Sequence, residues 1–238
     1  MKYVVPEGKC VFCGTAFGKA EMERHLRTCP ARKALSEKNQ RKNRGWKEGI
    51  FTLLVEGSYL PIYWMYLDVA ADSTLKDLDS FLRDIWLECC GHLSAFTIDK
   101  KQYLSQLSKD PLWSIFGRRE EFDMNIEIEK VLRPRLKFFH EYDFGTTTEL
   151  VLKVVMFRKE KVKSRSIRLL ARNDPPSILC DACGAQATKV CACCIWSEKA
   201  WFCNGCAKNH DCGEEMFLPV VNSPRVGMCG YTGPFSGG

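Results

Sequence analysis

The chain has 238 residues and a formal net charge of +6; 45% of its residues are hydrophobic and 27% are charged. This length fits one core of ordinary size with small satellites, or two modest domains, and the composition excludes wholesale disorder. No stretch reaches the ~20 apolar residues that span a bilayer, and the first residues, MKYVVPEGKC, lack the apolar segment of a secretory signal. We therefore expect a cytoplasmic protein.

The cysteines divide the chain into segments. Twelve of its 14 cysteines lie near the two ends, mostly as C-x2-C pairs, and no export signal accompanies them. Metal binding explains such pairs better than disulfides do. We therefore expect about three zinc ions. The expected segments are a zinc finger at 1–30, a basic linker at 31–47, an α+β domain at 48–172, and a double-zinc module with a tail at 173–238.

The first pattern along the chain is a pair of cysteines followed by a histidine and a third cysteine. Cys10 and Cys13 form C-x2-C, and His25 and Cys29 form H-x3-C. A tight turn places two thiolates at one ion, and two ligands four residues apart on a helix complete a tetrahedron. The pattern resembles a two-cysteine, two-histidine zinc finger with cysteine in place of the last histidine. Because so short a unit buries too little surface to fold alone, we expect zinc to supply its folding energy.

Most of the positive charge lies in the finger and in the linker that begins at Pro30. Residues 1–49 carry 12 lysines and arginines against 5 acidic residues, whereas 50–179 carry 19 of each and 180–238 carry 4 against 5. These side chains could neutralise phosphates of DNA or RNA, or they could form a solvated linker, and the sequence supports both interpretations. A single finger reads only about three base pairs, so nonspecific, structured-RNA or protein contact fits better than sequence-specific recognition. The basic residues are Arg24, Arg27, Arg32, Lys33, Lys38, Arg41, Lys42, Arg44 and Lys47.

The body opens with two apolar segments and an amphipathic one. Residues 50–56 and 59–69 are rich in aliphatic and aromatic residues and flank Gly57-Ser58, which predicts a β-hairpin. Apolar side chains then recur every three or four residues from 75 to 86, which predicts a helix that lies on the sheet, with Ser73 or Asp72 as its cap.

Further strands are expected at 92–98, 135–144 and 149–159, the last two joined through Gly145. Strands followed by a helix and then by strands again differ from a regular βαβ alternation. The predicted fold is therefore α+β, with a central antiparallel β-sheet packed with helices and small zinc-binding modules at both termini.

Several short motifs give residues 50–157 a family resemblance. They are Pro61-Ile62-Tyr63-Trp64, Thr74-Leu75-Lys76-Asp77-Leu78, His92-Leu93 with Phe96, and Tyr142-Asp143-Phe144-Gly145. With them the body resembles the plasmid pRiA4b ORF-three-like family, which also occurs as passenger proteins of insertion elements. The resemblance implies an α+β fold and a mobile-element or defence neighbourhood, but no particular chemistry. An acidic residue and a tryptophan usually follow the glycine in that family, whereas Thr146, Thr147 and Thr148 follow it here.

Titratable residues of the body suggest an alternative function. His92, His140, Glu141 and Asp143 could act as acid/base groups if they met in one cleft, as in a hydrolase or nuclease associated with a mobile element or defence system. On a strand, however, His140 and Asp143 point to opposite faces. The chain also lacks a phosphate-cradling glycine loop, G-x-S-x-G and H-E-x-x-H. The sequence therefore favours a binding protein over an enzyme and predicts no catalytic residue and no small-molecule cofactor.

The most specific signal is a run of four ligand pairs that begins at residue 180. The pairs are Cys180 with Cys183, Cys191 with Cys194, Cys203 with Cys206, and His210 with Cys212. The pairs resemble the cross-braced zinc modules of the MYND and B-box group, in which pairs one and three share one ion and pairs two and four share the other. The resemblance implies one site made of Cys180, Cys183, Cys203 and Cys206, and a second made of Cys191, Cys194, His210 and Cys212. Four sulfur or imidazole ligands leave no open position, so these would be structural sites.

Four cysteines remain outside this scheme. Cys193 could replace its neighbour Cys194 as a ligand. We interpret Cys229 as an incidental thiol in a surface tail, and Cys89 and Cys90 as buried core thiols.

The predicted function is a zinc-stabilised adaptor that binds a protein partner through the body or the C-terminal module and contacts nucleic acid through its basic N-terminal segment. A role for zinc in stability alone is the remaining alternative.

Overall fold

The computed structural model describes residues 3–4, 6–40, 46–107, 121–197 and 199–234. Within these ranges one large sheet contains β1 (Gly8–Cys10), β2 (Ala16–Phe17), β3 (Trp46–Gly57), β4 (Trp64–Ala70), β5 (Ser94–Ile98), β6 (Lys101–Leu104), β7 (Glu121–Asp123), β8 (Lys137–Tyr142), β9 (Thr148–Lys163) and β10 (Ile167–Asn173). The helices are α1 (Lys19–Thr28), α2 (Pro30–Gln40) and α3 (Leu75–Leu82), with a π-helical turn at Arg83–Leu87 and a 3-10 turn at Ile128–Lys130. A C-terminal module contains β11 (Lys189–Cys191), β12 (Trp201–Phe202), α5 (Asn204–Ala207), a 3-10 turn (Glu214–Met216) and β13 (Phe217–Pro219).

The large sheet has the order β2-β1-β10-β4-β3-β9-β8-β5-β6-β7. Its neighbouring strands are antiparallel except β6 and β7, which pair in parallel. This is the α+β architecture with a central sheet that the sequence predicts. The N-terminal segment belongs to this sheet, because β1 pairs with β10 from Gly8 opposite Asn173 to Cys10 opposite Ala171.

The strand pairs expected in the body are present. β3 pairs with β4, with Val55 opposite Met65, and β8 pairs with β9 through the turn that contains Gly145. The second strand of the first hairpin begins only at Trp64, later than the apolar run suggests. Residues 58–63 form the connection instead, in which Tyr63 N donates to Leu60 O at 3.0 Å.

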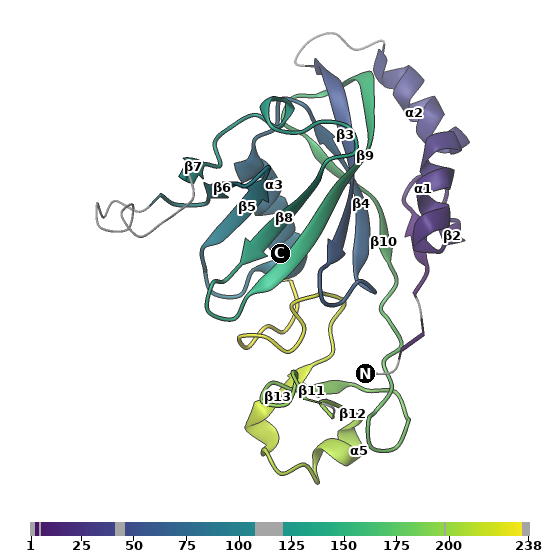
Figure 1. The fold of residues 1–238 in the computed structure, drawn as a ribbon. Helices are drawn as coiled ribbons and strands as arrows, with labels where there is room; N and C mark the ends of the chain where they lie inside the picture. Colours follow the sequence, from purple (N-terminus) through teal and green to yellow (C-terminus); the bar gives the residue numbers. More distant parts are fainter. Residues whose placement is uncertain (1–2, 5, 41–45, 108–120, 198, 235–238) are drawn as a thin grey trace.

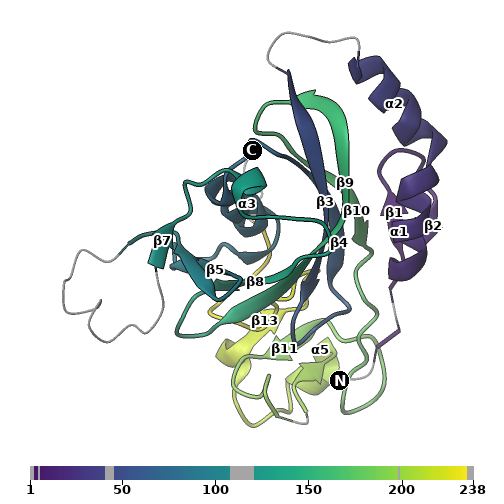
Figure 2. The same ribbon diagram turned by 45° about the horizontal axis from the view of Figure 1, so that its top comes forward.

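Alternate side chains of the central strands are buried on the two opposite faces of the sheet. Leu53, Met65 and Leu67 pack in the main core beneath α3, whereas Leu54 and Tyr66 pack with α1 in a second, smaller core. Because side chains alternate along a strand, α3 and the pair α1–α2 cover opposite faces, as Figures 1 and 2 show. The C-terminal module continues the main core, to which it contributes Val190 and Trp201.

The cap of α3 differs from the prediction. Thr74 caps the helix: its hydroxyl accepts from Asp77 N, and the Asp77 carboxylate accepts from Thr74 N at 2.8 Å, a reciprocal capping box. Ser73 is buried, and the Asp72 carboxylate accepts from Arg165 N at 3.0 Å in the β9–β10 turn. The predicted cap was wrong because it did not take Asp77 into account, which lies three residues after Thr74 and completes the capping box with it.

The first part of the expected linker is a helix. α2 begins at Pro30, where the fixed φ of proline suits the first helical position and its missing N–H costs nothing. The sequence of this helix is polar and shows no apolar face that would predict it. Its contact with the sheet includes a charged side chain, that of Arg32. Residues 41–45 of the linker lie outside the described residues.

Arg32 is a structural residue and does not belong to the exposed basic set predicted from the sequence. Its guanidinium donates to both Asp68 carboxylate oxygens at 2.9 Å and to Leu26 O at 2.6 Å. Arg158 binds the same carboxylate from β9, and Thr52 donates to it at 2.6 Å. Two arginines on one buried carboxylate hold α2 to the sheet, and they lower the pKa of Asp68 although burial alone would raise it.

Substituting Asp68→Asn should destabilise the protein by about 3–5 kcal/mol, because the change removes the counter-ion of Arg32 in a desolvated site and leaves Arg158 with Glu160 alone. Urea unfolding in zinc-containing buffer measures the loss. Asp99→Asn is the matched control, because Asp99 pairs with Arg133 at an exposed position and should lose much less. Equal losses in the two variants would contradict a structural role for Arg32.

Candidate metal centres

Four groups of cysteine and histidine side chains converge in the described residues. In each group the four donor atoms lie within 4.8 Å of one another. Three groups join the residues that the sequence places together: Cys10, Cys13, His25 and Cys29; Cys180, Cys183, Cys203 and Cys206; and Cys191, Cys194, His210 and Cys212. The fourth joins Cys89, Cys90, His92 and Cys229, which the sequence does not connect. Each group could hold a metal ion.

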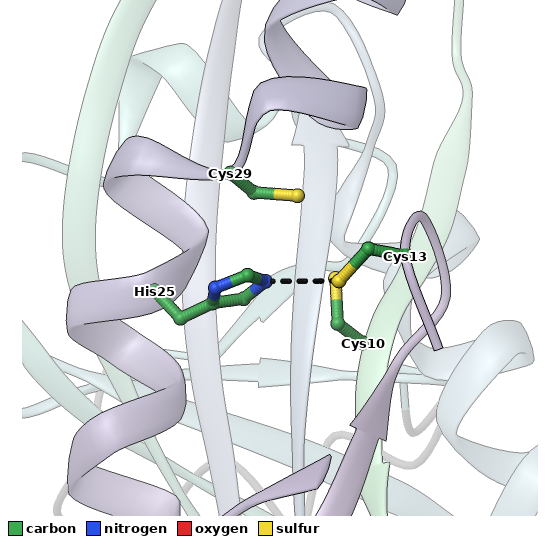
Figure 3. A group of neighbouring side chains, drawn as sticks. All are labelled: Cys10, Cys13, His25 and Cys29. Atoms are coloured by element: carbon green, nitrogen blue, oxygen red, sulfur yellow. Dashed lines mark hydrogen bonds between the residues drawn. The ribbon is translucent and has the colours of Figure 1, made fainter. Parts of the chain in front are cut away.

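The N-terminal group lies between a tight turn and a helix (Figure 3). In the turn, Gly14 N donates to Cys10 O at 2.8 Å, and Gly14 has a φ of 74°, a left-handed conformation that glycine adopts without strain. α1 presents His25, whose Nε2 lies 3.3 Å from Cys13 Sγ. Cys29 follows the helix, one turn beyond His25.

This group is fixed to the body. Cys10 and Cys29 are buried in the same small core as Leu54 and Tyr66 of the central strands. The Tyr66 hydroxyl donates to Lys19 O at 2.9 Å, which ties the start of α1 to β4. The finger therefore rests on the sheet and does not project from it.

The first C-terminal group repeats the same turn. Gly184 N donates to Cys180 O at 2.9 Å with a φ of 77° at Gly184, as Gly14 does at the N-terminal site. Cys203 caps the short helix α5, and its Sγ accepts from Cys206 N at 3.5 Å. A C-x2-C turn and a helix start thus face each other across the site.

The second C-terminal group is completed by the loop after α5. Cys194 Sγ lies 3.5 Å from His210 Nε2 and 3.6 Å from Cys212 Sγ. The His210 ring packs on Phe202, with centroids 4.6 Å apart. Cys193, which the sequence allows as an alternative ligand, is exposed and lies outside all four groups.

The fourth group corrects the interpretation of three cysteines. Cys90 is exposed, so it is not a buried core thiol, and Cys89 is only half-buried although it packs against the core. Cys229 is exposed as expected, but it lies 3.8 Å from Cys90 Sγ and 3.3 Å from His92 Nε2, so it is not isolated. The C-C-x-H motif at 89–92 could have indicated three ligands of a metal site. The fourth ligand could not be found from the sequence, because it is a single cysteine far away in the chain.

The sulfur spacings favour a metal over disulfides. Two sulfurs on one tetrahedral zinc lie about 3.8 Å apart, since each Zn–S bond is about 2.3 Å long. The observed separations are 3.7 Å for Cys183 and Cys203 and 3.6 Å for Cys194 and Cys212. All the cysteines are free thiols. The side chains are therefore spaced as they would be around an ion.

The thiols in each group influence one another's ionisation. The Thr15 hydroxyl, 3.4 Å from Cys13 Sγ, is the main cause that lowers the pKa of Cys13 to about 6. Hydrogen bonds with neighbouring sulfurs, Cys183 first, raise the pKa of Cys206 to about 12, and Cys194 does the same for Cys212. Thiolates so close cannot all ionise unless a cation compensates their charge, and a divalent metal ion supplies that compensation.

The structure brings together only part of the predicted hydrolase set, because His92 Nε2 lies 3.5 Å from Asp143 Oδ2 whereas His140 pairs with another residue. His140 is fully buried, and its Nε2 lies 2.7 Å from Asp79 Oδ1 beneath α3. His92 belongs to the fourth group, with its Nε2 2.9 Å from Cys90 Sγ. Asp143 lies just beyond the end of β8 at a φ of 65°, so strand alternation does not apply to it, and its carboxylate binds Arg225.

No helix in the described part of the chain combines the length and the apolar character that a membrane span requires.

Comparison with known proteins gives a structural likeness and no family. No protein-family model matches the chain, and no curated protein matches it. Among solved structures, the crystal structure of a protein of unknown function, MM3350 from Methanosarcina mazei Go1, matches with a TM-score of 0.41 and 13% sequence identity. The match covers 52% of this chain and 67% of that chain.

Proposed function

We propose that the protein is a zinc-stabilised adaptor. The observation that carries the proposal is that the three groups near the ends each present four thiol or imidazole donors with no place reserved for water. Closed sets of sulfur and nitrogen ligands are typical of structural zinc. Three zinc ions would fill these groups, and the free thiols favour a reducing compartment such as the cytoplasm.

The nucleic-acid part of the proposal rests on a basic surface formed by two segments. α2 contributes Lys33 and Lys38, both exposed. The end of the β9–β10 hairpin contributes Lys163, Arg165 and Arg168, also exposed. Arg32, Ser36 and Asn39 of α2 line one groove with Lys163 and Arg168, which places the two segments side by side. We call these five exposed residues the basic surface, and phosphates are the ligands that it suits.

The net charges of the three sequence segments do not reveal this basic surface. The middle of the chain is neutral in sum, yet residues 159–168 contain five basic residues and one acidic residue. Of the predicted N-terminal set, Arg24 and Arg27 remain exposed on α1, although Arg27 donates to Glu23 at 2.9 Å and to Val155 O at 2.7 Å. The proposed phosphate contacts therefore extend from α2 to the hairpin.

Reversing both charges in Lys33→Glu/Lys38→Glu should weaken binding to a short RNA or DNA roughly tenfold or more and reduce the log–log salt slope by about 2, one unit for each lost phosphate contact. Fluorescence anisotropy across a potassium chloride series measures both quantities. The control is Lys76→Glu/Lys101→Glu, which changes net charge equally on exposed residues of α3 and β6. Salt-independent binding, or equal loss in both double variants, would rule out the basic surface.

The protein partner of the proposal fits a groove between the body and the C-terminal module. Tyr59 and Trp196 are 71% and 66% exposed, and their rings meet edge to face at 6.4 Å. Trp201 and Val226 supply buried apolar atoms to the same groove, and Glu149 adds a carboxylate. Exposed aromatic rings beside a pocket are typical anchors in protein interfaces. The groove suits a peptide segment that places an aliphatic or aromatic side chain next to a lysine or arginine.

Selection of a displayed random-peptide library on the zinc-loaded protein should enrich that combination of residues. Trp196→Ala should weaken the selected peptides roughly tenfold or more, as expected for a central aromatic anchor. Val4→Ala, which truncates an apolar residue that is 65% exposed elsewhere, should leave the affinity unchanged. Failure to select any peptide, or equal affinity for both variants, would remove the groove from the proposal.

The resemblance to the plasmid family adds a context to this proposal. We propose that the adaptor serves a mobile element or a defence system, as members of that family are met there. The basic surface and the groove would then join nucleic acid to a partner protein of that system.

A further inference from the structure

The fourth group connects two distant parts of the chain. Cys89, Cys90 and His92 lie in the loop after the π-helical turn that continues α3. Cys229 lies in the tail, defined here as residues 220–234, which runs from the C-terminal module back to the body (Figure 1). The body alone provides three donors, and the tail provides the fourth.

Most separations between the donor atoms of this group are those expected around a bound ion. Cys90 Sγ lies 3.5 Å from Cys89 Sγ and 3.8 Å from Cys229 Sγ. His92 Nε2 lies 3.3 Å from Cys229 Sγ. Around a tetrahedral zinc, two sulfurs would be about 3.8 Å apart, and a sulfur and a nitrogen about 3.5 Å apart. Cys90 Sγ and His92 Nε2, at 2.9 Å, are closer than this, whereas the other separations agree with those in the groups at the ends of the chain.

A buried arginine beside the group supplies the charge that such a centre needs. Arg225 is 0% exposed, and it donates to Cys89 Sγ at 3.3 Å and to Asp143 Oδ2 at 2.8 Å. Three thiolates and one zinc ion carry a net charge of −1, which a guanidinium in contact with a ligand sulfur stabilises, although Arg225 also pairs with the Asp143 carboxylate. Arg225 comes from the same tail as Cys229, so the tail brings both a ligand and its counter-charge.

The Asp143 carboxylate already accepts hydrogen bonds from other residues, so it does not replace one of the four donors. Its Oδ2 accepts from Arg225, and its Oδ1 accepts from Gly145 N at 3.0 Å. Although Oδ2 lies 3.5 Å from His92 Nε2, the carboxylate is thus held by other donors. Three sulfurs and one imidazole nitrogen remain as the ligand set.

We propose that Cys89, Cys90, His92 and Cys229 bind a fourth zinc ion, which fastens the C-terminal tail to the body. This site goes beyond the three zinc ions of the proposed adaptor and does not depend on its nucleic-acid or protein partners. The fastened tail has a clear structural consequence. Pro224, Val226 and Met228 of the tail line the groove beside Trp196, so the ion holds one wall of that groove in place.

The tail also contacts the body at residues away from the proposed ion, and a test must distinguish the effect of these contacts from that of the ion. Ser223 donates to Trp86 O at 2.7 Å, and Tyr231 is buried. These contacts dock the middle of the tail, whereas the zinc ion would hold the loop at Cys229. Loss of the ion should therefore loosen the tail without unfolding the sheet.

The first measurement is a zinc count on the full-length, reduced protein by elemental analysis. The unaltered chain should hold four equivalents of zinc, and Cys229→Ser should hold three. His92→Ala, which removes no thiol, should also hold three. The control is Cys193→Ser, because Cys193 is an exposed cysteine outside every group, and it should still hold four.

The second measurement uses trypsin, because Arg225 is the one basic residue among positions 220–238. Its burial protects the bond after it in the fastened tail. Mass spectrometry should detect release of the peptide that begins at Val226 roughly tenfold faster from Cys229→Ser than from Cys193→Ser, since cleavage follows the population of the open form.

Three equivalents of zinc in the unaltered chain, unchanged in Cys229→Ser, would overturn the fourth site and leave the adaptor proposal intact. A disulfide between Cys90 and Cys229 in protein purified under reducing conditions would also overturn it. A protein without any bound zinc would refute both proposals together, so the two failures are distinguishable.

Discussion

Sulfur atoms held less than 4 Å apart repel one another once they are ionised, and the fold brings such atoms together in the C-terminal module and beside α3. At the N-terminal end the donor atoms of Cys10, Cys13, His25 and Cys29 lie within 4.8 Å of one another. A divalent cation converts that repulsion into attraction. The strands around these groups are two or three residues long, as in β1, β2, β11 and β12. Strands so short do not persist without support. Under the proposed function, an ion bound between the thiols would therefore help to fix the position of each end.

Docking the two ends on one sheet creates surfaces that no single segment contains. On one face, two arginines on the Asp68 carboxylate hold α2 beside the β9–β10 hairpin, so two basic segments become one. At the other end, the module and the tail close against the β3–β4 connection and leave Tyr59 and Trp196 beside a groove. Zinc would act on both surfaces indirectly, because it sets where the segments lie.

Local patterns in the sequence are enough for much of the fold. Two runs rich in aliphatic and aromatic residues on either side of Gly57-Ser58 predict the hairpin, and the helical spacing from Leu75 predicts α3, because each signal lies within one short window. The C-x2-C pairs place three of the four groups for the same reason, although the grouping of the C-terminal pairs rests on a family resemblance. Metal binding by these residues stays a prediction.

The features that sequence reasoning missed depend on contacts between distant residues. Arg32 looks like one of many linker charges until Asp68 is placed beneath it. Cys229 looks like an isolated thiol until the tail returns to Cys90. The argument from strand alternation does not apply to Asp143 for another reason, since the strand ends at Tyr142 and the chain turns at Asp143. In each case the missing information is a tertiary contact or a chain reversal.

Amide hydrogen exchange on zinc-loaded and chelator-treated protein tests the central claim most directly. If zinc orders the ends, residues 8–29 and 180–219 should lose protection when zinc is removed. β3, β4 and β9 should keep theirs, because one face of each packs in the main core, whose fully buried residues include no metal ligand. Unchanged protection of both ends in protein shown by elemental analysis to contain no zinc would contradict the account.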